Sequence, residues 1–367
     1  MKSEIPLLKV FMPTDIGPYV LDTLKSGQVA EGPKVIEFER QLGYYIGNDK
    51  VVATNSCTGA LTMALQLSGV GPGSEVITTA LTCQSTNQPI LNLGGKIVWA
   101  DIQKETGNID PKDVENKITP YTKAIIVMHW AGLPGDLDEL NMIAKKHNIK
   151  LIEDAASAFG AEYKYSKIGN HSDFVCFSFQ AVKHITTGDG GALFVKDEEI
   201  KRRATLLRNN GNDKKAKRTA TNWYSDISES GWKFHMNDIA ATIGIKQLEY
   251  QKDLLEKRVK NGNYLNLNLI NVSGLELLER KSDRLSAFWI FSLLVDNRED
   301  FVKYLKENGI QSGIVHQRND GHSIYKDFKT KLPNLDYFEN KMINIPVGWW
   351  IEKDQIEYMV DVIKKGW

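Results

Sequence analysis

Residues 178–191 read SFQAVKHITTGDGG and place two ionisable side chains, Lys183 and His184, between an apolar run and a glycine-rich turn. An adjacent lysine and histidine can act as a nucleophile with its base, can bind a phosphate, or can belong to a solvated bend. The residues directly after the turn, GALFV, form a short apolar run that is typical of a buried strand. The stretch therefore predicts a strand, a polar turn and a second strand, and its chemistry depends on what surrounds it.

The first two-thirds of the chain alternate short β-branched runs with segments of helical periodicity. Near-continuous apolar strands separated by helices predict an α/β fold with a mostly parallel sheet that helices cover on both faces. The expected strands are KVVATN, EVITTALT, KIVWADI, KAIIVMHW, IKLIEDA, DFVCFSF and GALFV, at residues 50–55, 75–82, 96–102, 123–130, 149–155, 173–179 and 191–195.

The pattern changes after residue 244, where a long charged helical stretch begins. Beyond it we expect one strand at 288–296, a helix near 298–308 and a C-terminal helix from 353. The sequence therefore predicts two domains, a large α/β domain at 1–245 and a small α+β domain at 246–367.

The 46 basic and 46 acidic side chains cancel, so the chain of 367 residues has no net charge. A neutral protein has no long-range field that favours nucleic acid or an anionic membrane, and neither is an expected partner. No apolar stretch reaches membrane-spanning length, and residues 1–15 lack the apolar core of a signal peptide. The three cysteines form no CxxC pair, which indicates the reducing cytoplasm.

Four polar side chains lie at or just beyond the expected strand ends: Thr58, Cys83, Asp154 and Ser178. Ligands of open α/β sheets bind beyond the carboxyl ends of the strands, so one ligand could contact all four. The dinucleotide motif is excluded, because GDGGAL differs from G-x-G-x-x-G and precedes a strand instead of linking a strand to a helix. No Walker A sequence is present either.

Two of these stretches allow more than one interpretation. In VVATNSCTGALTMALQL a helix begins near Gly59, so its free amides and the Thr58 hydroxyl can hold a phosphate, although capping by Ser56 or Thr58 is the simpler explanation. In LIEDAASAFGAEY strand alternation places Glu153 and Asp154 on opposite faces, so at most one of them faces the site. A buried carboxylate needs a partner, either an arginine or a protonated ring nitrogen of a cofactor.

Five motifs, in order along nearly the whole chain, resemble the DegT/DnrJ/EryC1/StrS aminotransferases: SGQVAEGPKVIEFE, TNSCTGALTMAL, IEDAASAFGA, FSFQAVKHITTGDGGAL and GWKFHMNDIAATIGIKQL. The resemblance implies the fold-type I architecture and the cofactor pyridoxal 5'-phosphate (PLP), which cycles through pyridoxamine phosphate (PMP). It also implies a homodimer with shared active sites, and an enzyme that aminates keto groups on nucleotide-linked sugars.

The resemblance assigns roles to individual residues. Lys183 matches the lysine that binds the cofactor aldehyde covalently, whereas His184 is one position too late. A lysine near a cationic ring in a partly dry pocket has a lowered pKa, which keeps its amine available as nucleophile and base. Asp154 matches the acid that pairs with the pyridinium nitrogen and so lets the ring accept electrons. Cys57, Thr58, Gly59 and Ser178 match the positions that bind the cofactor phosphate. Lys233 and His235 match a segment that enters the neighbouring subunit's site, where either could contact the phosphate or the substrate.

The chain departs from the family pattern around the cofactor ring. Cys83 replaces the usual stacked aromatic; it is either a ring contact or a buried structural cysteine, and Trp130 is the candidate aromatic that compensates. Ser157 replaces a glutamine or histidine beside the phenolic oxygen, and its hydroxyl can still donate a hydrogen bond. His322 matches the histidine that approaches the sugar, with a surface histidine as the alternative. No metal site is expected, because His316 and His322 lack a suitably spaced carboxylate or cysteine partner.

We therefore expect a cytoplasmic, homodimeric PLP-dependent aminotransferase that moves an amino group from L-glutamate to a nucleotide-linked 4-keto-6-deoxyhexose for polysaccharide or glycoside synthesis. Lysine at position 183 argues against the related sugar 3-dehydratases, which carry histidine there. The alternatives are such a dehydratase, an aminotransferase for a non-nucleotide carbonyl such as a cyclitol or a small phosphorylated ketone, and a non-catalytic regulator on the same fold.

Overall fold

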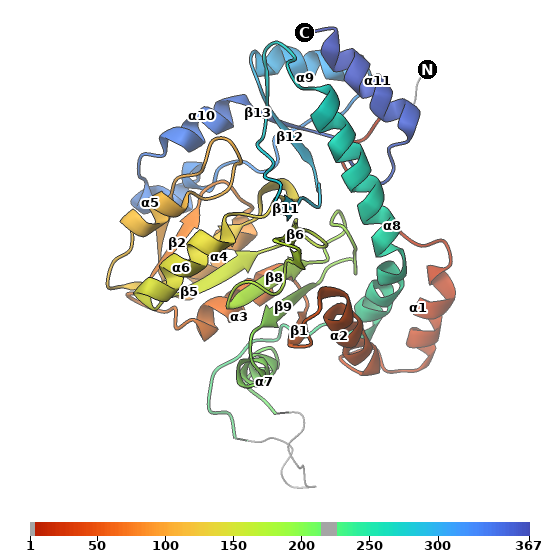
Figure 1. The fold of residues 1–367 in the computed structure, drawn as a ribbon. Helices are drawn as coiled ribbons and strands as arrows, with labels where there is room; N and C mark the ends of the chain where they lie inside the picture. The colour runs from red at the N-terminus through yellow and green to blue at the C-terminus, as the bar shows by residue number, and fades with distance from the viewer. Residues whose placement is uncertain (1–3, 214–225) are drawn as a thin grey trace.

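The computed structural model describes residues 4–213 and 226–367, and a seven-stranded sheet of order β1-β9-β8-β5-β4-β2-β3 forms its centre (Figure 1). Only β9 runs antiparallel to its neighbours in this sheet. The seven expected runs supply all seven strands, so the predicted α/β fold with a mostly parallel sheet is confirmed. The strands are β1 (Val51–Thr54), β2 (Glu75–Thr79), β3 (Lys96–Ala100), β4 (Thr122–Met128), β5 (Lys150–Asp154), β8 (Phe174–Ser178) and β9 (Gly191–Val195).

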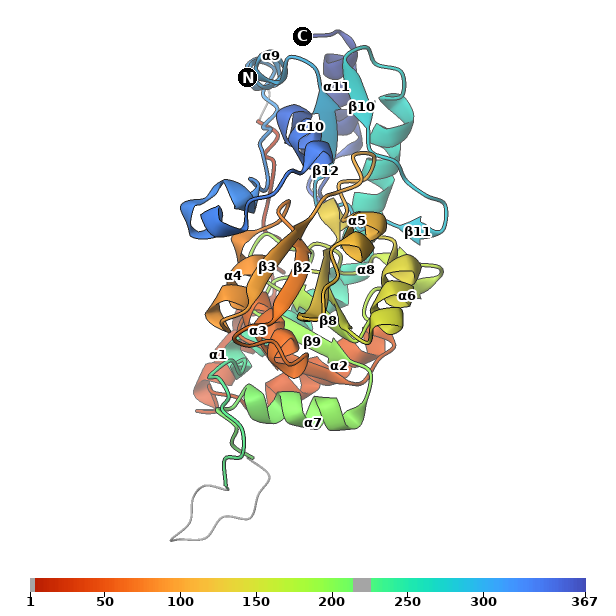
Figure 2. The same cartoon turned by 90° about the vertical axis from the view of Figure 1, so that its left-hand side faces the viewer.

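Helices cover both faces of this sheet. Successive residues of a strand point to opposite faces, so they pack into two different apolar cores. In β4, for example, Ile126 packs into the core beneath α3 (Cys57–Leu67), α4 (Gln84–Asn92) and α7 (Glu198–Leu207). Its neighbour Val127 packs into the opposite core. That core is covered by α2 (Pro33–Ile46), α5 (Pro111–Asn116), α6 (Leu137–His147) and the start of α8 (Asp238–Asn268). Figure 2 shows the sheet with α3 and α4 on one side and α6 on the other.

The helix α8 leads from this body to a smaller C-terminal unit with its own apolar core (Figure 1). An antiparallel sheet of order β10-β12-β13 forms the unit's centre, and β12, α9 and α11 match the expected strand and two helices. The elements of the unit are β10 (Leu275–Leu277), β12 (Phe291–Val295), α9 (Arg298–Glu307), α10 (Pro333–Lys341), β13 (Met342–Ile345) and α11 (Lys353–Lys364). The remaining elements are α1 (Ile16–Lys25), β6 (Glu162–Tyr163), β7 (Ser166–Lys167), β11 (Arg284–Leu285) and three 3-10 helices at Trp130–Gly132, Asn319–Gly321 and Ser323–Phe328.

The expected division between residues 245 and 246 falls inside α8, which continues through it without a break. At the other end of the chain, Ile5 pairs with Ile310 and packs into the core of the C-terminal unit, although the expected boundary assigns it to the large domain. The division into two domains stays a prediction.

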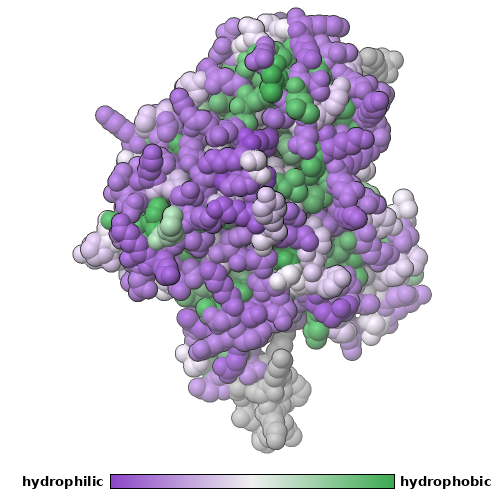
Figure 3. All heavy atoms as spheres, viewed as in Figure 1, coloured by the Kyte–Doolittle hydropathy of each residue, from purple (hydrophilic) through white to green (hydrophobic). Residues whose placement is uncertain are grey.

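Hydrophilic residues cover most of the face shown in Figure 3, and hydrophobic residues gather mainly in its upper part. Among residues 4–213 and 226–367, no helix is both long and apolar enough to cross a membrane. Within the same ranges, no three His, Cys, Asp or Glu side chains are grouped so that they could hold a metal ion.

Candidate active site

The Lys183 side chain lies in the turn between β8 and β9, and its amine is directed into the protein. Nζ donates a hydrogen bond to Ser157 Oγ at 3.2 Å and lies 3.6 Å from the ring centroid of Trp289. Although Lys183 as a whole is only half-buried, burial of the amine lowers its pKa, and the nearby Asp154 carboxylate partly opposes this effect. A larger share of the amine is therefore unprotonated at neutral pH than for an ordinary lysine, as nucleophilic chemistry requires.

Asp154 ends β5 and faces the same core as Cys176, its neighbour on β8. Its Oδ2 accepts a hydrogen bond from Thr86 Oγ1 at 2.6 Å, and its Oδ1 accepts one from the amide of Ala156 at 3.0 Å. Hydrogen bonds to a carboxylate favour its charged form, so this side chain is suited to pair with a cation.

Glu153 points to the opposite face of β5, as strand alternation predicts, and there it pairs with His129. The two side chains are fully buried, and His129 Nε2 lies 2.8 Å from Glu153 Oε2. The amide of Gly135 donates to His129 Nδ1, so Nε2 carries the proton and donates to the carboxylate. Of the two adjacent acids, only Asp154 faces Lys183.

Three strand ends meet at the start of α3. Gly191 pairs with Thr54 on one side and with Ser178 on the other, which brings Ser178 close to the helix N-terminus. A Cβ atom at Gly191 would lie only 2.5 Å from the amide nitrogen of Cys57, so glycine allows the strand to approach the helix this closely.

The structure shows the expected cap at the start of α3, and phosphate binding there stays a prediction. Ser56 caps the helix, because its Oγ accepts a hydrogen bond from the Gly59 amide at 3.1 Å. Cys57 and Thr58 form the first turn, whose amides point out of the helix N-terminus and can bind an anion. The buried Ser178 hydroxyl lies nearby and accepts from the Gln180 amide at 3.3 Å. This donor set fits a phosphate group.

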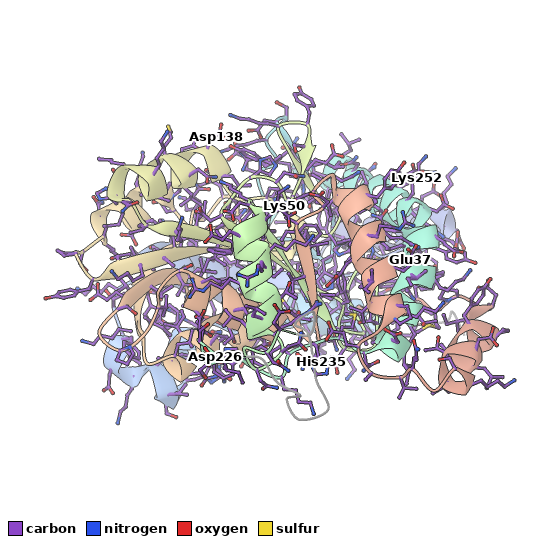
Figure 4. The ribbon with its side chains drawn as sticks, turned by 90° about the horizontal axis from the view of Figure 1, so that it is seen from below. Glu37, Lys50, Asp138, Asp226, His235 and Lys252 are labelled. Carbon is purple, nitrogen blue, oxygen red and sulfur yellow. The ribbon has the colours of Figure 1, made fainter. Side chains whose placement is uncertain are left out.

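The segment GWKFHM lies beside the same helix start. Asn55 donates from Nδ2 to the carbonyl of Lys233 at 3.2 Å, and Thr54 pairs with His235, which Figure 4 labels. The Lys233 side chain is exposed on this chain, whereas His235 is half-buried.

Cys83 and Ser157 both lie near the Lys183 amine. Ser157 is buried and accepts the lysine hydrogen bond, and Cys83 is half-buried at the start of α4. A charge on Cys83 would act on the pKa of Lys183, so the thiol lies within electrostatic reach of the amine. Whether Cys83 contacts a cofactor ring stays a prediction.

The aromatic residue against Lys183 is Trp289, and the sequence did not point to it. Trp130 is a core residue: only 1% of it is exposed, and its indole N–H donates to Ser292 Oγ at 3.1 Å while its ring packs edge-on against Phe338. The structure therefore places Trp130 in the core, and its contact with a cofactor or substrate stays a prediction. Trp289 is held by a hydrogen bond of 2.9 Å from its indole N–H to the carbonyl of Val182, directly before the lysine.

His316, in the C-terminal loop, lies within electrostatic reach of Lys183. Its ring stacks on Trp289 with a centroid distance of 5.7 Å and an interplanar angle of 20°. Burial lowers the pKa of His316 to about 4, and the charge of Lys183 contributes, so this imidazole is neutral at physiological pH. His322 is exposed and stays a predicted substrate contact.

His184 turns away from the site. Its Nε2 donates to the carbonyl of Ala287 at 2.9 Å, and burial, with the charge of Arg258, lowers its pKa well below the usual value. The prediction that His184 is a hydrogen-bonding neighbour of Lys183 and not the nucleophile is consistent with this contact.

Taken together, these residues fit PLP: an anion site at α3, a carboxylate suited to a protonated ring nitrogen, and a buried amine with a lowered pKa. Which residues contact the cofactor stays a prediction.

No strand or helix pattern could have found Trp289, His316 or Thr86, because their places depend on tertiary packing.

Comparison with known proteins finds relatives along the whole chain. The model of the DegT/DnrJ/EryC1/StrS aminotransferase family matches residues 12–364. The spore coat polysaccharide biosynthesis protein SpsC of Bacillus subtilis is 33% identical over 359 residues, which cover 94% of this chain and 92% of SpsC. The UDP-4-amino-4,6-dideoxy-N-acetyl-beta-L-altrosamine transaminase of Campylobacter jejuni is 32% identical over 361 residues, which cover 94% of each chain.

Solved structures show the same fold. The sugar aminotransferase CalS13 from Micromonospora echinospora has a TM-score of 0.96 and 38% identity, covering 99% of this chain and 100% of CalS13. Spr1654 from Streptococcus pneumoniae, solved in a PMP form, has a TM-score of 0.92 and 29% identity, covering 98% of both chains. Its PLP form has a TM-score of 0.91 and 28% identity, covering 99% of this chain and 98% of that chain.

Proposed function

We infer the reaction of this chain from the family to which it belongs, the DegT/DnrJ/EryC1/StrS aminotransferases. Members of this family are PLP-dependent sugar aminotransferases, so the chain is a PLP-dependent transaminase. The observation that carries a catalytic role is the buried Lys183 amine, whose pKa is lowered and which faces the Asp154 carboxylate.

We propose that the amino donor is L-glutamate and that the acceptor is a nucleotide-linked keto sugar, specifically a 4-keto-6-deoxyhexose. Support comes from the Campylobacter jejuni relative, whose name describes a transaminase of a UDP-linked 4-amino-4,6-dideoxy sugar. The name of SpsC places that relative in polysaccharide biosynthesis. The cytoplasm is the proposed compartment, because Cys57, Cys83 and Cys176 are all free thiols.

We propose the following roles for the chain's own residues. PLP, when bound, supplies an aldehyde that reacts with amines and a ring that accepts electron density. Lys183 provides the attacking amine and, once released, moves a proton as the base. Asp154 holds the proton on the ring nitrogen, and the start of α3 with Ser178 binds the phosphate.

A homodimer with shared sites is part of the proposal. The exposed Lys233 side chain lies in a segment that would enter the neighbouring subunit's site and add positive charge near the phosphate. Three large apolar side chains on α1, Tyr19, Leu21 and Leu24, are also exposed and are suited to a subunit contact.

The test measures two reactions separately: transfer of the amino group from the donor to the cofactor, and its transfer from the cofactor to the sugar. PLP-loaded protein mixed with L-glutamate alone should convert to the PMP form, seen by absorbance, and K183A should not. The PMP form should then aminate a nucleotide-linked 4-keto-6-deoxyhexose, with the amino sugar identified by mass spectrometry. Equal rates with the nucleotide removed would favour a non-nucleotide carbonyl, a deoxygenated product would favour the dehydratase, and no conversion with any donor would contradict a transaminase.

A further inference from the structure

Two threonine hydroxyls lead from the start of α4 to Asp154. Thr86 Oγ1 donates to Asp154 Oδ2 at 2.6 Å, and Thr82 Oγ1 lies 2.7 Å from Thr86 Oγ1. Both threonines are fully buried. An ionised carboxylate only accepts hydrogen bonds, so Thr86 directs its proton to Asp154 and accepts the proton of Thr82. The order of donors is therefore Thr82, Thr86, Asp154.

The far end of this chain of hydroxyls is anchored by Asn319 from the C-terminal unit. Asn319 is fully buried, and its Nδ2 donates to the carbonyl of Thr82 at 2.7 Å. Its own amide donates to the carbonyl of Ala80 at 2.8 Å, and its Oδ1 accepts from Asn87 Nδ2 at 2.8 Å. These bonds fix the backbone at Thr82 and so restrict where its hydroxyl can point.

The titratable groups that interact with Asp154 cannot replace these hydrogen bonds. Burial raises the pKa values of Cys57 and Cys176 well above the usual value, and the negative charge of Asp154 adds to the effect, so both are neutral thiols. Lys183 also interacts with Asp154, and its own pKa is lowered by burial. When that amine is engaged in chemistry, the Thr86 hydroxyl and the Ala156 amide are the described donors that stabilise the carboxylate.

We propose that Thr86, supported by Thr82, is a positioning residue whose hydrogen bond holds the Asp154 carboxylate directed at the ring nitrogen of bound PLP. The inference rests on the proposed function. A hydrogen bond to a carboxylate favours its charged form, and an ionised Asp154 favours a protonated ring nitrogen. Loss of the hydroxyl leaves the ring less positive, so the nitrogen that links Lys183 to the cofactor retains its proton to a higher pH.

The test is a pH titration of the absorbance of the PLP-loaded protein, together with PLP affinity, for T86V and T86S. T86V should raise the pKa of the lysine–cofactor linkage by about one unit and weaken PLP binding about tenfold, whereas T86S should restore both. Thr82→Val removes the preceding donor and should shift the same pKa in the same direction by less, which keeps the test available if T86V does not fold.

Thr242→Val is the matched control. Thr242 is also buried and donates to the carbonyl of Asp238 at 2.8 Å, but it lies on α8 against Thr23 of α1. This variant should lose stability without moving the linkage pKa. Titration and PLP binding of T86V like those of the unmodified protein would overturn the inference, as would an equal shift in T242V. Absence of any lysine–cofactor absorbance in the unmodified protein would contradict the proposed function instead.

Discussion

The imidazole of His129 donates to Glu153 across 2.8 Å, and neither side chain is exposed to solvent. This pair lies on the face of β5 opposite to Asp154, so it stabilises the strand that carries Asp154 without facing Lys183. A buried carboxylate without its partner is strongly unfavourable.

His129→Leu should therefore lower the free energy of unfolding by about 3–5 kcal/mol, because it leaves the Glu153 carboxylate buried and unpaired. The double variant His129→Leu with Glu153→Leu should recover most of this loss, since no isolated charge remains. Urea denaturation of the three proteins measures both effects. A single variant as stable as the unmodified protein, or a double variant no better than the single one, would show that the hydrogen bond from His129 does not compensate the burial of the Glu153 carboxylate.

His316 should make the protein less stable as the pH falls. Its pKa in the folded protein is about 4, against an ordinary value of 6.5, so the unfolded chain binds more protons between these two values. The stability contributed by the neutral ring is fully present above pH 6.5, the ordinary pKa of histidine. It is lost as the pH falls from 6.5 toward about 4, the pKa of His316 in the folded protein. One histidine accounts for at most about 1.4 kcal/mol per pH unit.

His316→Phe keeps a ring against Trp289 but does not titrate. The free energy of unfolding of this variant, measured by denaturation at several pH values, should depend less steeply on pH than that of the unmodified protein within this window. His322→Phe is the control, because His322 is exposed, and it should leave the slope unchanged. Equal slopes for the unmodified protein and His316→Phe would contradict the burial of a neutral His316.

Gly191→Ala should weaken PLP binding more than an ordinary surface substitution. The added Cβ would approach the Cys57 amide to 2.5 Å and displace the first turn of α3, which is the proposed phosphate site. Overpacking of this kind costs about 1–3 kcal/mol, and we expect PLP affinity to fall about tenfold or more. Gly71→Ala is the control, since a Cβ there has no atom within 4 Å. Unchanged PLP affinity in Gly191→Ala, measured by cofactor titration, would show that the close approach is not needed.

Much of the fold could be predicted because the central strands are short, continuous apolar runs that are covered on both faces. The β5 run also predicted correctly that Asp154 and Glu153 face opposite sides, since alternation is a local property of a strand. Trp130 and Trp289 illustrate the limit. Trp130 ends one apolar run and Trp289 begins another, so the sequence does not distinguish them. Only the packing of the C-terminal unit against the large one places Trp289 beside Lys183, while Trp130 bonds to Ser292 in the core.

The same limit applies to the polar residues around the site. Thr86 lies within a helical stretch whose sequence gives no sign that its hydroxyl reaches Asp154. His316 and His322 belong to one loop. The resemblance pointed to His322, whose role stays a prediction, and nothing in the sequence indicated that the ring of His316 stacks on Trp289. Contacts between segments far apart in the chain leave no periodic signal in the sequence.

The most direct measurement is borohydride reduction of the PLP-loaded protein, followed by proteolysis and mass spectrometry. Reduction fixes the cofactor to the amine that holds it, so the modified peptide identifies the lysine. We predict that the label is found on Lys183 alone and that it disappears in K183A. A label on a different lysine, or a protein that takes up no PLP and remains colourless, would contradict the account.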